Sequence, residues 1–332
     1  MLHFPRIPEK YKPSKPFAGL LVHIGGVIAG LGIFQFIALL PALFMLPSVA
    51  DLLAVSEGNY RNVDPHAARV VLLTLLGLGS FGGFILMPLV VNRLYDKLPA
   101  RAFSPELRFP GLVIPATIFA LLFFLPFDGF IVEWNRNLAF PEFMRGFADW
   151  AREAEDKATK MTEMITGLDS LPELALGMLV VAVIPAIGEE LFFRGVLQTR
   201  LRLLTGNVHA GIWLSAFLFS AIHMQFFGFV PRMLLGLMFG YIYAGSGNLV
   251  LPMIAHFVNN GLTLLSMYLY KHKLISLDPD SADIAPWYMA VVSGTVAAAL
   301  IYYVANTYSK LPKNDFRTFT DHKLSFGEHE AD

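Results

Sequence analysis

The chain has 332 residues, of which 55% are hydrophobic and only 15% charged, and its net charge at pH 7 is −1. This composition is more apolar than that of a soluble domain and indicates a polytopic membrane protein, and the near-zero charge excludes a nucleic-acid-binding surface, which needs a concentrated basic field. Cysteine is absent, which excludes a disulfide framework and thiolate chemistry.

The predicted fold class is all-α, because only helices and closed barrels satisfy the backbone in lipid and the apolar runs have helix length. A helix needs about 20 mostly apolar residues to cross a bilayer. About eight such spans are expected, the fifth and sixth being short enough to be tilted or re-entrant. They cover residues 17–45, 69–91, 109–127, 172–198, 209–225, 230–245, 249–270 and 286–306.

Lysine and arginine residues in the connecting segments predict the orientation, because cytoplasmic loops carry an excess of them. They place both termini in the cytoplasm, and Lys271 and Lys273 on the outer side are a mild violation. The basic residues that support this orientation are Arg6, Lys10, Lys12, Lys15, Arg93, Lys97, Arg101, Arg108, Arg200, Arg202, Lys310, Lys313, Arg317 and Lys323.

The segment between the third and fourth spans predicts an amphipathic helix. Within residues 138–168, aromatic side chains recur at helical spacing with charged residues on the other face, which fits a helix lying along the membrane surface or one packed on the outer loops. Ser170 and Glu173 then have capping-box spacing around Pro172, so a new helix is expected to start there.

We therefore divide the chain into five parts by composition. They are a cytoplasmic segment 1–16, three transmembrane helices in 17–127, an extracytoplasmic or interfacial segment 128–171, a membrane core 172–306 and a polar cytoplasmic tail 307–332. Glycine pairs with small-xxx-small spacing, Gly26/Gly30 and Gly79/Gly83, predict close helix packing among the first spans.

The fourth span contains charges where water is scarce, in the sequence GEELFFRG. Each charge at a helix centre costs at least about 2.5 to 3.5 kcal/mol, so such groups are functional candidates. Glu190 and Arg194 are four residues apart on one face and can satisfy each other. Glu189 lies about 100° further round the helix and needs another partner.

Two other spans supply polar groups for a shared site. His223 lies on the fifth span, and His256 and Asn260 lie four residues apart on one face of the seventh. A lone buried histidine is more often a structural residue bonded to a carbonyl. We interpret His23 and Gln35 of the first span in that way, but polar groups on three helices indicate a site.

These residue types suit amide hydrolysis by activated water. Glu189, a carboxylate in a low-dielectric pocket beside a second acid, can take up and return a proton, and His223 can hold the same water. His256 and Asn260 can donate hydrogen bonds to the oxyanion. The lack of cysteine and of a serine in a G-x-S-x-G context disfavours a covalent intermediate.

Three motifs on separate spans resemble those of a known family. They are Glu189-Glu190-x-x-x-Arg194, Phe219-x-x-x-His223 and His256-x-x-x-Asn260. In this order they resemble the CPBP family of intramembrane endopeptidases, also called type II CAAX prenyl endopeptidases. The resemblance covers about residues 172–265.

The resemblance implies a catalytic core in which Glu189 and His223 activate water, His256 and Asn260 stabilise the oxyanion, and Glu190 with Arg194 maintains the shape of the site. It implies a peptide or protein substrate, lipid-modified or membrane-bound, and an integral protein of a bacterial inner membrane. No cofactor is favoured. Zinc bound by Glu189, His223 and His256 stays an alternative, although neither histidine belongs to an H-E-x-x-H helix.

Two other functions remain open at this point. Buried Glu and His also serve as proton relays, so a proton-coupled transporter is possible, although no inverted repeat is visible. A non-catalytic binding or immunity protein of the same fold is the other alternative.

Overall fold

The computed structural model describes residue 4, residues 7–276 and residues 286–312 of the chain. Within these ranges the chain is helical and contains no strand, which confirms the predicted fold class. Arg6, Lys313, Arg317 and Lys323, and with them most of the tail 307–332, lie outside the described residues.

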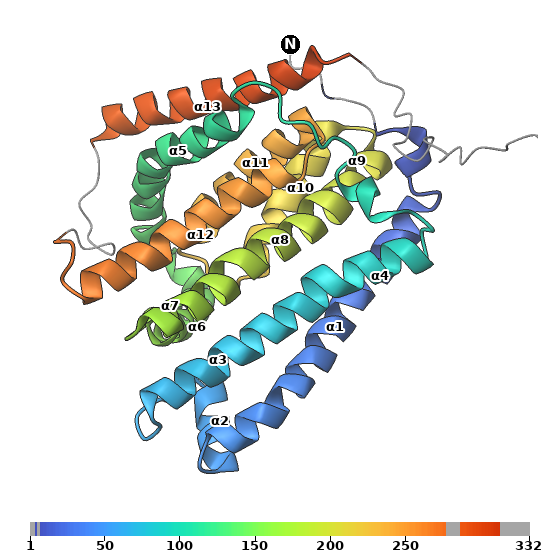
Figure 1. Cartoon of the computed structure of the whole chain (residues 1–332). Helices are drawn as coiled ribbons and strands as arrows, with labels where there is room; N and C mark the ends of the chain where they lie inside the picture. Colours follow the sequence, from blue (N-terminus) through green and yellow to red (C-terminus); the bar gives the residue numbers. More distant parts are fainter. Residues whose placement is uncertain (1–3, 5–6, 277–285, 313–332) are drawn as a thin grey trace, which may run out of the picture.

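The helices run in roughly parallel and antiparallel directions through the molecule (Figure 1). The α-helices of the described part are α1 (Pro16–Met45), α2 (Val49–Ser56), α3 (Pro65–Ser80), α4 (Met87–Leu94), α5 (Val113–Arg136), α6 (Arg145–Thr166), α7 (Leu171–Gly177), α8 (Ile184–Glu190), α9 (Thr199–Thr205), α10 (Val208–Ala221), α11 (Phe229–Ser246), α12 (Val250–Lys271) and α13 (Trp287–Ser309). Single turns of 3₁₀-helix lie at Glu9–Tyr11, Ala100–Phe103 and Glu142–Met144, and π-helical segments at Phe81–Leu86, Met178–Val183 and Leu191–Gln198.

Among the described residues, six continuous helices are long and apolar enough to cross a membrane. They are Glu9–Met45, Pro65–Leu94, Val113–Arg136, Leu171–Thr205, Val250–Lys271 and Trp287–Ser309. The chain is therefore a polytopic helical membrane protein. The third span continues to Arg136, so residues 128–136, which the sequence division placed in the extracytoplasmic segment, are part of this helix.

The fifth and sixth predicted spans are the shorter helices α10 and α11. α10 has 14 residues and is about 21 Å long, less than the roughly 30 Å of a hydrocarbon core. Short connections join α9 to α10 and α11 to α12, so α10 starts and α11 ends at the same end of the molecule. The two helices thus pack as a hairpin joined by the turn of residues 222–228, in which Ile222 and Met224 are exposed.

The fourth span is one helix of 35 residues, Leu171–Thr205, with two π-helical segments on either side of α8. The hydroxyl of Ser170 accepts from the backbone N–H of Glu173, which confirms the predicted helix start. The helix extends past the predicted end at residue 198. With this extension, Glu189 lies near the middle of the span, between the two π-helical segments. Such interruptions of an α-helix are frequent at functional sites.

Two helix groups flank this central helix (Figure 1). On one side α1 packs on α3, α4 and the π-helical segment Phe81–Leu86. A Cβ at Gly30 would lie 2.7 Å from the carbonyl oxygen of Gly82, so the small residue is required for this close approach. On the other side α5 packs along α13, and α12 packs on α8.

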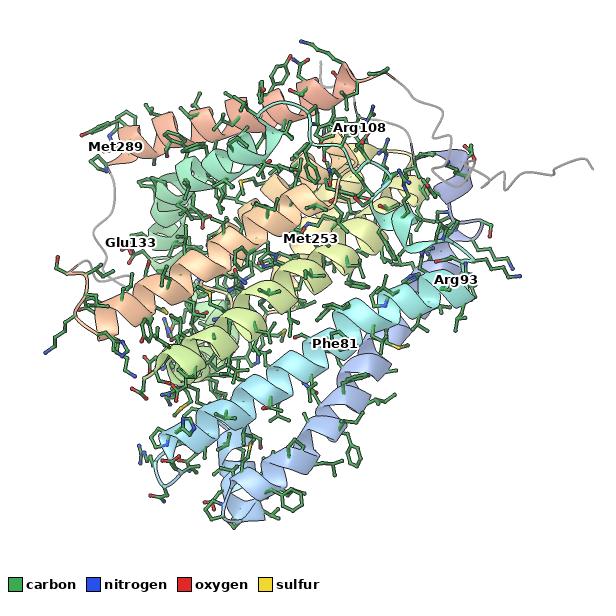
Figure 2. The ribbon with its side chains drawn as sticks, in the orientation of Figure 1. Phe81, Arg93, Arg108, Glu133, Met253 and Met289 are labelled. Atoms are coloured by element: carbon green, nitrogen blue, oxygen red, sulfur yellow. The ribbon has the colours of Figure 1, made fainter. Side chains whose placement is uncertain are left out.

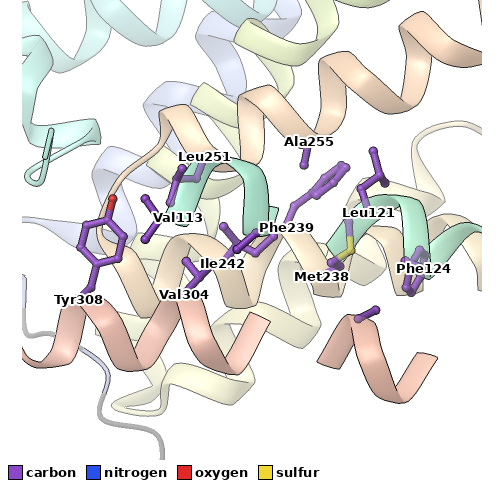
Figure 3. Close-up of a cluster of buried hydrophobic side chains, with 12 residues drawn as sticks. Val113, Leu121, Phe124, Met238, Phe239, Ile242, Leu251, Ala255, Val304 and Tyr308 are labelled. Atoms are coloured by element: carbon purple, nitrogen blue, oxygen red, sulfur yellow. The ribbon is translucent and has the colours of Figure 1, made fainter. Parts of the chain in front are cut away.

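A cluster of buried hydrophobic side chains joins α5, α11, α12 and α13 (Figure 3). Phe239 of α11 is fully buried in it beside Leu251 and Ala255 of α12. Burial of apolar surface on the inner helix faces fixes the positions of α11 and α12 relative to each other. The residues that follow Ala255 on α12 include His256, so this core positions one wall of the site.

Helix α6 is the amphipathic helix that the sequence predicts, and it both packs and faces outward. It contacts α3 and α12, and the ring of Phe147 packs 5.5 Å from that of Phe226. Phe143, in the turn just before it, is 87% exposed. One face therefore covers the end of the bundle, and the other suits a membrane interface.

Labelled residues mark the two ends of the bundle. Figure 2 shows Arg93 and Arg108 at one end and Glu133 and Met289 at the other. Lys271, the mild violation of the charge rule, donates to Asp169 at 2.6 Å, so a carboxylate compensates its charge.

Candidate active site

The acidic pair of the fourth span lies in the centre of the bundle. Glu190 and Arg194 are both almost completely buried, and Arg194 Nη1 donates to Glu190 Oε1 at 2.7 Å. Arg194 Nη2 donates to the carbonyl oxygen of Gly236 on α11 at 3.0 Å. The pair therefore links the fourth span to α11 as well as satisfying its own charges.

His256 of α12 lies between the two adjacent glutamates. Its Nδ1 donates to Glu190 Oε1 at 2.9 Å, and its Nε2 lies 3.9 Å from Glu189 Oε2. Glu189 is the more open of the two acids, with 17% of its side chain exposed against none for Glu190. Glu190 is thus the buried anchor, and Glu189 is the acid that reaches accessible space.

Aromatic rings separate and orient these polar groups. The guanidinium carbon of Arg194 lies 4.8 Å from the ring centre of Phe219 and 5.3 Å from that of Phe239. Phe239 also stacks on the imidazole of His256 with centroids 5.3 Å apart. Such contacts add cation–π attraction and hold both side chains in one orientation.

His223 lies just after the end of α10, next to the same ring. Its imidazole meets Phe219 edge-on at 5.4 Å, and its Nδ1 donates to the carbonyl oxygen of Phe219 at 2.8 Å. A neutral imidazole that donates from Nδ1 keeps Nε2 as an acceptor. His223 is half-buried, so this acceptor is available to a ligand of the site.

Asn260 is one turn beyond His256 on α12, and its amide contacts the fourth span. Its Nδ2 donates to the carbonyl oxygen of Val181 at 2.9 Å, and its Oδ1 accepts from Asn259 at 3.1 Å. The amide nitrogen carries two N–H groups, so one donor is left over. Asn260 therefore also ties α12 to the π-helical segment Met178–Val183.

The structure brings four of the six predicted side chains into direct contact or near-contact: Glu189, Glu190, Arg194 and His256. His223 joins them through the shared ring of Phe219. Asn260 bonds to Val181 rather than to any of the other five.

Sequence reasoning missed three residues that complete the site. Phe239 carries no motif signal. Gly236 could have been predicted as a close-packing position, since Gly236 and Gly240 repeat the small-xxx-small spacing noted on the first spans. Arg232 is a charge inside the predicted span 230–245, and it interacts electrostatically with Glu189 and Asp128. The intramembrane-charge argument applied to the fourth span also identifies it.

The zinc alternative needs three ligands around one point. Within the described ranges, no group of three or more His, Asp or Glu side chains is arranged so that it could hold a metal ion. As they stand, Glu189, His223 and His256 do not form a three-ligand site.

Comparison with known families matches the part of the chain that carries the site. Residues 171–262 match the family model described as Type II CAAX prenyl endopeptidase Rce1-like. This range starts with α7 and ends within α12, so it includes all three motifs. The resemblance predicted from those motifs is thereby confirmed for this segment.

One curated relative matches part of the chain. The chain is 35% identical over 77 residues to "Uncharacterized protein YpbD" of Bacillus subtilis (strain 168), an alignment that covers 22% of this chain and 36% of the relative. The chain thus covers about a third of that relative's length. No solved structure matches the chain.

Proposed function

We propose that this chain is an intramembrane endopeptidase that hydrolyses a peptide bond with water activated by Glu189 and His223. The observation that carries the proposal is that the two adjacent glutamates have different environments. Glu190 is fully buried and bonded to Arg194 and His256, whereas Glu189 is accessible and faces Nε2 of His256. An accessible carboxylate next to a fixed charge network has the properties of a general base.

In the first step, Glu189 takes a proton from water while the oxygen attacks the carbonyl carbon of the scissile amide. Nε2 of His223 accepts the other O–H of that water and so aligns it. In the second step, the protonated Glu189 returns its proton to the amide nitrogen and the C–N bond breaks, which gives a carboxylic acid and an amine. The acid then passes its proton to the amine, so a carboxylate and an ammonium group leave. No bond to the protein forms at any point.

The tetrahedral intermediate carries a negative oxygen that needs donors. We assign these to Nε2 of His256 and to the second N–H of Asn260. Because Nδ1 of His256 already donates to Glu190, a donating Nε2 requires the doubly protonated ring, for which Glu189 and Glu190 are the neighbouring counter-charges. Removing one such donor lowers kcat by about 10²- to 10³-fold in other hydrolases.

We also propose that no metal takes part, a view supported by the lack, among the described residues, of three His, Asp or Glu side chains arranged to hold a metal ion. Chelators of divalent metals should then leave cleavage by the purified protein unchanged. Loss of activity with a chelator, and its recovery with zinc, would contradict this part of the proposal.

The test of the proposal compares Glu189→Gln with the wild-type protein in detergent or vesicles. Peptides that carry a lipid-modified cysteine near the C-terminus, and their unmodified counterparts, serve as substrates. Glu189→Gln keeps the shape and removes the base, so cleavage should fall by about 10²-fold or more. The matched control is Glu142→Gln, an exposed glutamate outside the site that should retain full activity.

The substrate class and location follow as further proposals. The family description names a CAAX prenyl endopeptidase, which supports a peptide or protein substrate held at the membrane. The even number of spans among the described residues leaves the start of α1 and the end of α13 on the same side. The basic end near Arg93 and Arg108 supports a cytoplasmic location for that side, in the inner membrane of a bacterium.

A further inference from the structure

The turn between α10 and α11, residues 222–228, follows the motif phenylalanine and contains His223. The last turn of α10 is irregular: His223 N–H donates to the carbonyl oxygen of Ser220 at 3.3 Å, and Met224 has a positive φ of 55°. Helix ends fray unless other groups hold them. The position of His223 therefore depends on what fixes the residues after it.

Asn135, near the end of α5, fixes this turn from one side. Asn135 is completely buried. Its Nδ2 donates to the carbonyl oxygen of Phe226 at 3.2 Å, and its Oδ1 accepts from the backbone N–H of Val230 at 2.9 Å. One amide thus bonds both the end of the turn and the start of α11. A carboxylate or an apolar side chain of the same size cannot supply both the donor and the acceptor.

Glu155, in the middle of α6, fixes the turn from the other side. Its Oε2 accepts from the backbone N–H of Phe227 at 3.3 Å, and its Oε1 accepts from Gln225 at 3.4 Å. Gln225 in turn accepts from Arg232 of α11 at 2.7 Å. The amide of Asn135 and the carboxylate of Glu155 therefore bond the carbonyl oxygen and the N–H of one peptide group, between Phe226 and Phe227.

Aromatic packing supports the same arrangement. The ring of Phe226 lies 4.8 Å from that of Phe140 and 5.5 Å from that of Phe147. These rings place the start of α6 against the turn, which brings Glu155, two helical turns later, within reach. Polar and apolar contacts thus act on the turn together.

We propose that Asn135 and Glu155 are positioning residues for His223, acting through the backbone of residues 225–230. The proposal rests on the proposed function. Both residues lie outside the segment 171–262 that matches the endopeptidase family, so the chain supplies these contacts from its third span and its amphipathic helix. Neither side chain bonds to the water or the substrate in this role.

The experiment measures kcat and KM together with the mobility of the turn. The chain contains no cysteine, so Met224→Cys, at a position that is 57% exposed, gives a single site for a nitroxide spin label. Asn135→Ala and Glu155→Ala are introduced separately, with and without this label. Asn137→Ala is the matched control, because Asn137 is exposed directly after the end of α5 and its side chain bonds to Glu133.

Each of the two alanine variants should lower kcat by about 10- to 100-fold with KM within about twofold, because a displacement of about 1 Å in a catalytic group costs up to about 10² in rate. The spin label should become more mobile in the same variants. Glu155→Gln keeps one acceptor and should lie between Glu155→Ala and wild type. Asn137→Ala should match wild type in both measurements.

Unchanged kcat in both alanine variants overturns the proposal, and so does a lowered kcat without increased label mobility. Should Asn135→Ala fail to fold, Glu155→Ala still decides, because Glu155 is on the amphipathic helix and only half-buried. The two proposals fail in different ways. Full activity of Glu189→Gln contradicts the endopeptidase mechanism. Loss of activity in Glu189→Gln, together with full activity in the two alanine variants, contradicts the positioning role alone.

Discussion

At the scale of single residues, adjacent glutamates have opposite environments. Glu190 bonds to Arg194 and His256 at the closed centre of the bundle, and Glu189, one residue before it, faces accessible space. The helical rotation of about 100° per residue produces this difference. The sequence spacing of Glu190 and Arg194 was enough to predict their ion pair, but the bond from His256 to Glu190 was not predictable, because it depends on how α12 packs against α8.

Removal of Glu190 tests the value of this buried pair. Glu190→Ala leaves Arg194 as a buried charge without its carboxylate, and the protein should lose about 3 to 5 kcal/mol of unfolding free energy. Glu190→Gln keeps an acceptor for Arg194 and His256, so its loss should be smaller. Thermal unfolding in detergent measures both, and equal stability of Glu190→Ala and wild type would show that the pair contributes nothing.

At the scale of elements, the sequence predicts the positions of the helices well but the end of the fourth one poorly. The spans at 17–45 and 249–270 agree with α1 and α12 to within a residue at each end. The fourth helix instead runs on to Thr205, because polar residues after Gln198 ended the apolar run without ending the helix. Arg200 is buried and paired with Asp96 there, a contact that hydropathy does not register.

The glycines of α1 that face α3 and α4, and those that do not, should change stability in opposite directions when replaced by alanine. A Cβ at Gly30 would meet the backbone of Gly82, whereas nothing lies within 4 Å of one at Gly32. Gly32→Ala should raise stability by up to about 1 kcal/mol through helix propensity. Gly30→Ala should lower it by about 1 to 3 kcal/mol through overpacking. Thermal unfolding compares the two, and a stabilising Gly30→Ala would refute the close approach.

At the scale of the whole molecule, an ion network ties together three spans at one end of the bundle. Arg69 of α3 bonds to Asp169 and Glu173 before and within α7, and Lys271 of α12 also bonds to Asp169. The network joins the helix that carries Glu189 to the helix that carries His256. The sequence showed Lys271 only as an exception to the charge rule, because its partner is 102 positions away in the chain.

This network predicts a pH dependence of stability. The hydrogen bond from Lys271, with that from Arg69, holds the pKa of Asp169 below its ordinary value of about 3.9. A lowered pKa in the folded state contributes stability above the ordinary pKa, and this contribution is lost as pH falls through the lowered value. Wild type should therefore unfold at a higher temperature than Asp169→Asn near pH 6, and the difference should shrink below about pH 4. A difference that stays constant over this range would contradict the assignment.

Motifs far apart in the chain identified the candidate site, since each polar group stood out in an apolar helix. Its completion by Phe239, and its support by Asn135 and Glu155, came from tertiary packing between segments with no shared pattern. An isolated asparagine at the end of a span carries no signal of its own.

The most direct test of the account is a double-mutant cycle of kcat for peptide cleavage with Glu189→Gln, His223→Ala and the combination of both. If both side chains act on one water molecule, the double variant should be about as slow as the slower single variant, because groups that act as a unit are strongly non-additive. If the two losses in log kcat simply add, or if Glu189→Gln cleaves at the wild-type rate, the two residues do not share the water and the account is wrong.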